Sequence, residues 1–368
     1  MKRMIDRKKS LLFVFLLLGL TAGTIWAASP TVPNWAACGR TDAMIRRGIR
    51  ATILQRYRLA NAIFDSLIAE NPYDPRGYFY KAAAIQSKMM DAEDYSESPR
   101  FVATIKKAIQ FSDRIVAEMP GDAWATFYLG SGYSYYAFFL IQSRSYFSGL
   151  KLAVKGVGFL EKAVQLDSTV YDAYLGIGTY QYWRSRKTKF LKWLPFFPDK
   201  TREGLRNIKR ALEKSRYARA AALNELIWVE MDREDWPQAI AYAKEGLRQY
   251  PGSRFFLWPL AEAYFRSGRF RSAERAFSNL MEQYLSENLP NQYNAAVCAY
   301  KVAVSAYFDH DYVKSYNFCR KFFTLKNPPA YEERLKKKAK KLRRLLEENR
   351  RILEKTNPSV LGEKETSR

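Results

Sequence analysis

A series of similar helical segments at regular spacing is the feature that most constrains the fold of this 368-residue chain. The segments end at positions separated by 48, 48, 49, 34 and 34 residues, namely Pro72, Pro120, Ser168, Tyr217, Pro251 and Leu285. A period of about 20–50 residues is typical of arrays in which each unit buries its apolar face against its neighbours. The spacing therefore predicts an all-α solenoid.

The clearest unit is "LWPLAEAYFRSGRFRSAERAF", residues 257–277. Its small residues Ala261 and Ala273 stand at fixed distances from the large Tyr264 and Phe277, and Gly268 marks a turn between two helices. This pattern resembles the tetratricopeptide repeat, in which small residues lie where two antiparallel helices approach closely and large ones fill the space between them. The resemblance implies an α-solenoid of about six helical hairpins over residues 41–325.

Three consecutive hairpins are longer than the 34-residue period by 14 or 15 residues. The surplus falls between the two helices of each unit, at 91–99, 135–149 and 184–200. Either both helices are lengthened by two turns, or a loop is added. In the third case Pro195 and Pro198 interrupt any helix, so part of that surplus must be loop. We expect the three insertions to lie along one edge of the solenoid.

The N-terminal segment reads as an export signal. Residues 1–27 combine five basic residues with an apolar run of 16 and end in small residues. The run is short for a bilayer span of about 20 residues, so a cleaved signal peptide is favoured over an uncleaved anchor. We expect a linker at 28–40 and a location in the cell envelope, either periplasmic or membrane-associated.

The C-terminal region predicts a basic helix at 330–356 and a disordered tail at 357–368. Apolar residues recur on one face of that helix, and most of its other residues are Lys or Arg: the stripe is Leu335, Ala339, Leu342, Leu346 and Leu353. One interpretation is a capping helix that closes the last repeat. The other is a helix that lies on an anionic membrane, although its stripe has no Trp or Phe.

Residues needed for catalysis or metal binding are scarce. His310 is the only histidine, which excludes catalytic triads and multi-histidine metal sites. The glycine triplets at 130–132, 156–158 and 176–178 lack the context of a phosphate-binding loop and indicate close helix packing. Cys298 and Cys319 form either one disulfide or two buried thiols. We therefore predict a chain that is not an enzyme and that holds no cofactor or metal.

The resemblance also implies that the first helices of the hairpins form a concave surface for a partner protein. The matching positions are aromatic and apolar rather than a carboxylate clamp, and they predict a groove for an extended partner segment. Core packing between long helices is the alternative interpretation of the same rings. The groove candidates are Trp124, Phe127, Trp228, Trp258 and Phe265.

A second surface is predicted from "RSRKTKFLKWLPFFPDK", residues 184–200, where basic residues precede aromatic ones. Its rings could pack on the neighbouring insertion, contact a membrane interface or dock a partner. The net charge of +24 favours polyanions, and an exported chain meets anionic lipid or cell-wall polymer rather than nucleic acid. A peripheral membrane or polymer-binding protein is thus the alternative function. The residues are Arg184, Arg186, Lys187, Lys189, Lys192, Trp193, Phe196 and Phe197.

Overall fold

The computed structural model describes residues 33, 35, 39–188, 198–287 and 289–362. It separates the chain into two units, Met1–Thr31 and Val32–Arg368, and all of the first unit lies outside the described residues. The export signal or anchor at 1–27 therefore stays a prediction. Within the part predicted to be a disordered tail, residues 359–362 differ from the prediction by forming a short helix.

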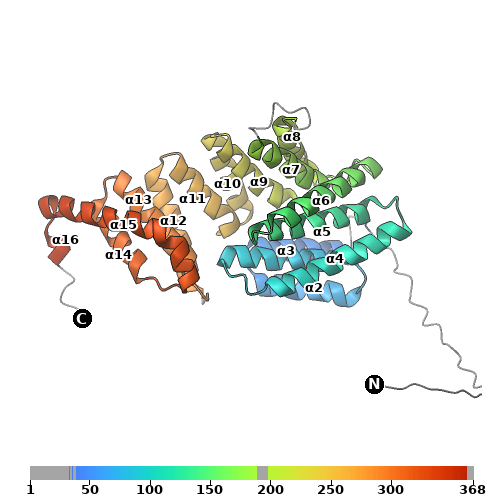
Figure 1. The fold of residues 1–368 in the computed structure, drawn as a ribbon, viewed down its shortest axis with the longest axis horizontal. Helices are drawn as coiled ribbons and strands as arrows, with labels where there is room; N and C mark the ends of the chain where they lie inside the picture. Colours follow the sequence, from blue (N-terminus) through green and yellow to red (C-terminus); the bar gives the residue numbers. More distant parts are fainter. Residues whose placement is uncertain (1–32, 34, 36–38, 189–197, 288, 363–368) are drawn as a thin grey trace, which may run out of the picture. The chain divides into compact units, whose positions relative to one another are not determined.

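Helices are the only regular elements of the described residues, and they follow one another as pairs (Figure 1). The predicted all-α solenoid is confirmed, and the described part of the chain forms seven pairs in place of about six because the last, weak unit forms a full pair. The helices are α1 (Arg40–Ile53), α2 (Tyr57–Glu70), α3 (Pro75–Ala92), α4 (Ser98–Glu118), α5 (Ala123–Gln142), α6 (Tyr146–Leu166), α7 (Ala173–Lys187), α8 (Thr201–Lys214), α9 (Arg219–Asp232), α10 (Trp236–Gln249), α11 (Arg254–Arg266), α12 (Phe270–Ser286), α13 (Tyr293–Phe308), α14 (Tyr312–Thr324), α15 (Pro329–Thr356) and α16 (Ser359–Gly362).

Six of the described pairs end their first helix in the same turn. In each, a backbone N–H donates to the carbonyl five residues earlier, as from Arg56 to Ala51 at 2.8 Å, and the preceding residue has a positive φ. This is the Schellman motif that commonly ends helices. Only one of the six residues at positive φ is a glycine, which adopts that conformation without steric cost. They are Gln55, Glu93, Arg144, Glu234, Gly268 and His310.

The three predicted insertions are confirmed and take two forms. Helices α3, α4, α5 and α6 have 18, 21, 20 and 21 residues, whereas α9 and α10 have 14 each. The first two insertions are therefore lengthened helices. In the third, α7 ends at Lys187 and α8 begins at Thr201, so the surplus lies in the connection. Residues 189–197 of that connection lie outside the described residues.

Glycines mark the closest approach of two helix pairs. A Cβ atom added to Gly130 of α5 would lie 2.8 Å from the Gly156 carbonyl oxygen of α6. One added to Gly178 of α7 would lie 2.6 Å from the Gly204 carbonyl oxygen of α8. Such distances leave no room for a side chain. The predicted packing role of the glycine triplets is therefore confirmed at Gly130, Gly156 and Gly178.

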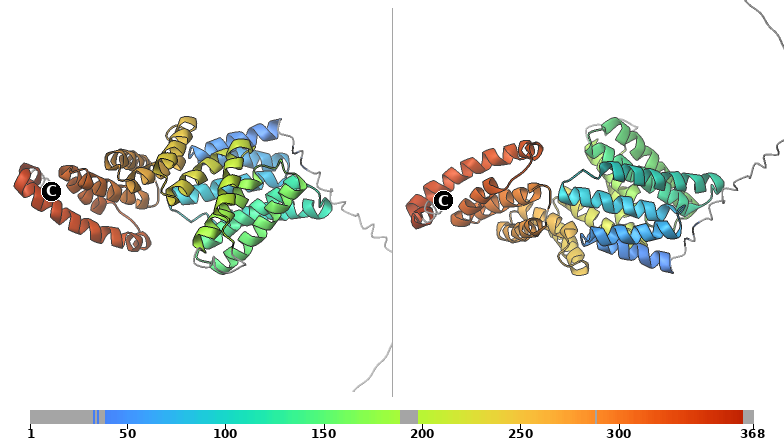
Figure 2. Two further views of the ribbon diagram at one scale, coloured as in Figure 1. Left: turned by 90° about the horizontal axis from the view of Figure 1, so that it is seen from above. Right: turned by 90° about the horizontal axis from the view of Figure 1, so that it is seen from below.

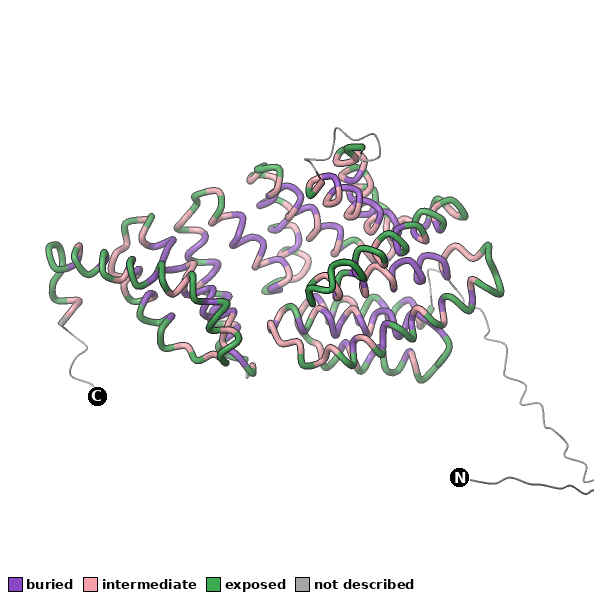
Figure 3. The backbone as a smooth tube through the Cα atoms, viewed as in Figure 1, coloured by how far each residue is buried: buried purple, intermediate pink, exposed green. Residues whose placement is uncertain are grey.

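Buried residues lie along the facing sides of the paired helices (Figure 3). Cys298 and Cys319 are buried as free thiols, so the disulfide alternative is not the one observed.

The predicted basic C-terminal helix is confirmed as α15, which lies along the last pair (Figure 2). Of its predicted apolar stripe, Leu335, Leu342 and Leu353 are buried and Ala339 and Leu346 are half-buried, while Leu345, which the prediction did not include, is buried too.

Helices α1 and α3 also contact late repeats. Ser253 Oγ, between α10 and α11, donates to the Ile53 carbonyl oxygen at 2.6 Å. Arg254 Nη2, at the start of α11, lies 2.6 Å from Asp91 Oδ2, near the end of α3. These partners are 200 and 163 residues apart in the sequence. The array thus joins its early and late pairs by polar contacts that no periodic pattern encodes.

Candidate functional site

Five aromatic rings from α3, α5 and the turn before α9 meet in one cluster, which we call the inner aromatic cluster. The Tyr80 and Tyr128 hydroxyl oxygens are 3.2 Å apart, and the Tyr80 and Tyr217 ring centroids are 5.7 Å apart. The Trp124 ring meets Phe127 edge-on at 5.5 Å and Tyr217 at 6.4 Å. Two of the five predicted groove residues, Trp124 and Phe127, therefore come together here.

Trp35 fills the space beside this cluster. Its ring stacks on Tyr128 with centroids 5.6 Å apart, and its Nε1–H donates to Asp122 Oδ2 at 2.8 Å. The Arg76 guanidinium lies 5.1 Å from the centroid of the indole ring, and Arg216 donates to the Trp35 carbonyl oxygen. The predicted linker at 28–40 is therefore wrong at Trp35, because ring stacking, a cation–π contact and hydrogen bonds hold it.

Charged groups fix the walls around Trp35. Arg216 Nε lies 3.0 Å from Asp42 Oδ1, and the Tyr217 hydroxyl donates to the same oxygen at 2.8 Å. Burial would raise the pKa of Asp42, but hydrogen bonds from Arg46, Tyr217 and Arg216 outweigh it and lower that pKa. Asp42 therefore stays ionised and holds Arg216 against the Trp35 segment.

A second carboxylate, Asp172, sets the backbone before α9. It accepts hydrogen bonds from the backbone N–H groups of Arg216, Tyr217 and Ala218 at 2.7, 2.8 and 2.9 Å. Burial raises the pKa of Asp172, and these three donors oppose the shift. The geometry is one of recognition, since stacking surfaces and fixed charges surround the indole of Trp35.

Sequence reasoning missed Trp35, Asp42, Asp172 and Arg216. The separations are the reason: Asp42 and Arg216 are 174 residues apart, and Trp35 and Asp122 are 87 apart. The available signal was a single Trp in a segment otherwise read as a linker.

The other three predicted groove residues lie in two further clusters, one with Trp228 and one with Trp258 and Phe265. Trp228 of α9 packs with α10 and α11, and Trp258 of α11 meets Phe277 and Tyr284, each at 6.1 Å between centroids. The Phe265 ring lies 3.8 Å below Lys301 Nζ. All three side chains are partly exposed. The structure thus brings Trp124 and Phe127 together at one place, brings Trp258 and Phe265 together at Phe277 of α12, and leaves Trp228 in a third cluster.

The pairing of helices, the shared Schellman turns and the glycine contacts decide the fold. It is a tetratricopeptide-like array. No protein-family model matches the chain, and no curated protein matches it.

Solved structures resemble this tetratricopeptide-like array at low sequence identity. A thermophilic TPR protein of Thermus thermophilus has 17% identity and a TM-score of 0.38, with 61% of this chain and 98% of that chain covered. Cut9-Hcn1 of the APC/C has 12% identity and a TM-score of 0.49, with 77% of this chain and 46% of that chain covered. PilW, a type IV pilus biogenesis factor, has 15% identity and a TM-score of 0.41, with 66% of this chain and 91% of that chain covered. Since these TM-scores are below 0.5, the fold assignment rests on the helix geometry.

The predicted basic-aromatic surface is only partly described. Arg186 Nε lies 2.5 Å from Asp232 Oδ2, the Arg184 guanidinium lies 5.8 Å from the Tyr180 ring, and Lys187 is exposed. The remaining residues of this surface lie outside the described residues: Lys189, Lys192, Trp193, Phe196 and Phe197. No helix among the described residues has both the length and the apolar character needed to cross a bilayer.

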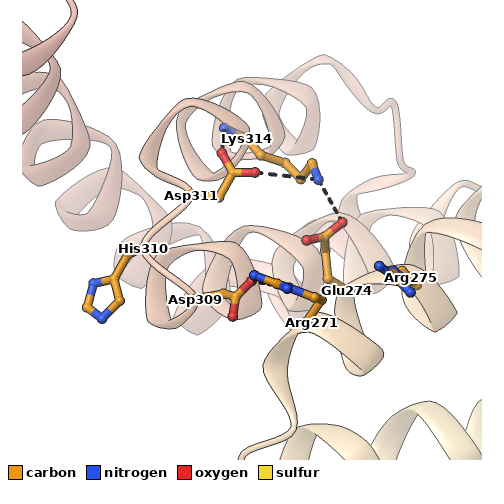
Figure 4. Close-up of a pocket in the computed structure, with 7 residues that line it drawn as sticks. All are labelled: Arg271, Glu274, Arg275, Asp309, His310, Asp311 and Lys314. Carbon is orange, nitrogen blue, oxygen red and sulfur yellow. Dashed lines mark hydrogen bonds and ion pairs between the residues drawn. The ribbon is translucent and has the colours of Figure 1, made fainter.

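A polar pocket of about 250 Å³ lies between α12 and the α13–α14 turn (Figure 4). Two ion pairs line it: Lys314 Nζ is 2.9 Å from Glu274 Oε1, and Arg271 Nε is 3.1 Å from Asp309 Oδ2. His310 points away from the Lys314–Glu274 pair and hydrogen-bonds Tyr312 at 3.0 Å. No cluster of His, Cys, Asp or Glu suited to a metal ion occurs among the described residues.

Proposed function

We propose that this chain is a non-enzymatic protein-interaction scaffold of the cell envelope. It binds an extended partner segment that carries an aromatic residue, on the inner face made by its first helices. The observation that carries the proposal is Trp35. The chain holds one of its own aromatic residues against α3 and α5 by stacking, hydrogen bonding to Asp122 and contacts with two arginines.

The face offered to a partner lies further along the array, on α9 and α11. Trp228 of α9 and Trp258 of α11 lie on successive first helices, and both side chains keep part of their surfaces exposed. Partly exposed Trp side chains at the centre of a surface commonly supply most of its binding free energy. Nearby, Lys301 Nζ lies 3.0 Å from Glu262 Oε1, so a charged pair borders the rings. This combination suits a segment with apolar and polar groups in alternation.

The envelope location rests on residues 1–27, whose basic start and apolar run are those of an export signal. A partner for the scaffold is therefore sought among envelope proteins. An affinity capture from native envelopes, with mass spectrometry of the retained proteins, identifies it.

The decisive comparison uses the Trp228→Ala/Trp258→Ala double variant. We expect this variant to retain the specific partner at least about tenfold less than the wild type, because two aromatic contacts are removed. Trp236→Ala, at the start of the second helix α10, removes an indole outside the inner face and is the matched control. Circular dichroism verifies that each variant is folded. Equal retention of the partner by the folded double variant and the wild type would overturn the proposed groove.

A further inference from the structure

An exposed apolar stripe lies at the start of α6, a second helix of its pair. Phe147 is 85% exposed, Leu150 59% and Val154 60%, and Tyr146 and Phe138 beside them are 59% and 45% exposed. Nearly all residues from 142 to 151 are exposed, with Gly149 as the exception. We call Phe138, Tyr146, Phe147, Leu150 and Val154 the α6 tip. Solitary exposed apolar residues are ordinary, but a contiguous set of five marks an interaction surface.

The spacing of the stripe shows that it is a second, outward face of the helix. Phe147, Leu150 and Val154 follow one another at intervals of three and four residues, which places them on one side of α6. The opposite side is already used, since Gly149, Gly156 and Leu160 are buried and Gly156 lies against α5. The stripe therefore serves neither the pairing of α6 with α5 nor the inner face made by first helices.

The charged residues of the segment that carries the α6 tip have one sign. No Asp or Glu occurs from residue 123 to residue 160, which covers all of α5 and most of α6. The same segment contains Arg144, Lys151 and Lys155, all exposed. Lys155 Nζ donates to the Tyr133 hydroxyl at 2.8 Å and lies 4.2 Å from the Tyr133 ring centroid. The segment thus combines the aromatic and aliphatic side chains of the α6 tip with three exposed positive charges and no acidic residue.

We infer that the α6 tip binds the surface of an anionic phospholipid bilayer. Phe147, Leu150 and Val154 would enter the boundary between head groups and acyl chains, and Arg144 and Lys151 would contact phosphate groups. An amphipathic helix with an apolar face and adjacent cations has this property. A second copy of the chain fits less well, because a symmetric contact would bring the same positive charges face to face.

This surface differs from the predicted basic-aromatic surface at 184–200 and does not depend on the proposed groove. Because α6 is a second helix, the α6 tip and the inner face of α9 and α11 can be occupied together. The chain could then hold a partner protein while it rests on a membrane.

The test is vesicle flotation of the full-length chain. The tip variant combines Phe147→Ser, Leu150→Ser and Val154→Ser. The matched control combines Leu59→Ser, Met119→Ser and Leu285→Ser, which are also exposed, at 38%, 44% and 36%, but lie apart from one another on α2, the α4–α5 turn and α12. Vesicles contain phosphatidylcholine with or without phosphatidylglycerol. Residues 1–27 are present in every variant, so their contribution to flotation is the same throughout.

We expect the tip variant to partition onto anionic vesicles at least about tenfold less than the wild type, and the control to match the wild type. The Arg144→Gln/Lys151→Gln variant should partition onto anionic vesicles about tenfold less than the wild type and onto neutral vesicles equally well. Hydrogen exchange should show slower exchange at residues 143–150 when anionic vesicles are added.

Two results would overturn the inference. One is a folded tip variant that floats like the wild type, with unchanged exchange at 143–150. The other is slowed exchange at these residues caused by a captured protein or by self-association in the absence of vesicles, which would make the tip a protein-binding surface.

Discussion

At the scale of single residues, the first helices change the chemistry of the groups between them. Glu225 of α9 accepts a hydrogen bond from Trp183 Nε1 of α7 at 2.6 Å. Burial raises the pKa of Glu225 above its ordinary value of 4.5, and hydrogen bonds from Trp183 and Thr179 oppose the shift. A carboxyl group with a raised pKa holds its proton longer in the folded chain than in the unfolded one. The structure therefore implies a pH-dependent contribution to stability from this residue.

The prediction for Glu225 has a definite sign. Between about 4.5 and the raised pKa, the folded chain binds more protons than the unfolded chain, so this residue's contribution to stability falls as the pH rises through that window. Glu225→Gln should remove that fall, because the amide oxygen still accepts from Trp183. Urea unfolding across the pH range measures it, with the exposed Glu213→Gln as control. A variant that is less stable than the wild type above the window would contradict the prediction.

At the scale of helices, close approach rather than propensity decides the pairing of α5 with α6 and of α7 with α8. Glycine weakens an isolated helix by about 1 kcal/mol relative to alanine. At Gly130, Gly156, Gly178 and Gly204 that loss is offset by backbone contact between the paired helices. Gly158 lies in α6 with no atom within 4 Å of an added Cβ, so a substitution there changes only the helix propensity of the residue.

This contrast predicts opposite effects of the same substitution. Gly178→Ala should destabilise the array by about 2–4 kcal/mol, because its methyl group would lie 2.6 Å from the Gly204 carbonyl oxygen. Gly158→Ala should stabilise it by about 0.5–1 kcal/mol through helix propensity. Thermal and urea unfolding measure both variants. Similar effects at the two positions would show that the α7–α8 crossing is looser than described.

At the scale of the whole array, a few polar contacts join repeats that are distant in the sequence. Arg254 lies between Asp91 and Glu287, at 2.6 and 2.5 Å, and is almost fully buried. Burial would lower the pKa of Arg254, but hydrogen bonds and the charges of Asp91 and Glu287 outweigh it and raise that pKa. Asn294 Nδ2 donates to the Asp91 carbonyl oxygen at 2.8 Å. The end of α3 is thus tied to α11 and α13.

Breaking this contact should weaken the association of early and late repeats. We expect Asp91→Asn to cost about 3 kcal/mol, because a buried cation loses one of its two partners. Combined with Arg254→Met, the cost should be less than the sum of the single changes by at least about 1 kcal/mol.

The control cycle uses Arg271→Met and Asp309→Asn, an ion pair in which Arg271 is 71% exposed. Its coupling should be below about 1 kcal/mol. Additive effects at Asp91 and Arg254 would mean that their ion pair does not join the repeats.

Much of the fold could be predicted because it depends on local pattern. The spacing of Ala261, Tyr264, Gly268 and Phe277 indicates a hairpin of short range, and the same reasoning applied along the chain predicts the helix pairs and the three insertions. The candidate site was harder to predict from the sequence than the fold. Aromatic residues of the first helices could be named as candidates from the sequence, but whether a ring is covered depends on segments far away, as Trp124 and Tyr217 illustrate.

By itself, the sequence determined that the chain folds as repeated helix pairs followed by a basic helix, since helix periodicity, turn residues and small-residue positions act over a few tens of residues. Only the tertiary structure decided which surfaces are occupied. It places Trp35 against Tyr128, ties Asp91 to Arg254 and leaves Phe147 in contact with solvent. These outcomes depend on how each helix pair is rotated against the next, and small rotations add up over seven pairs to set which distant residues meet.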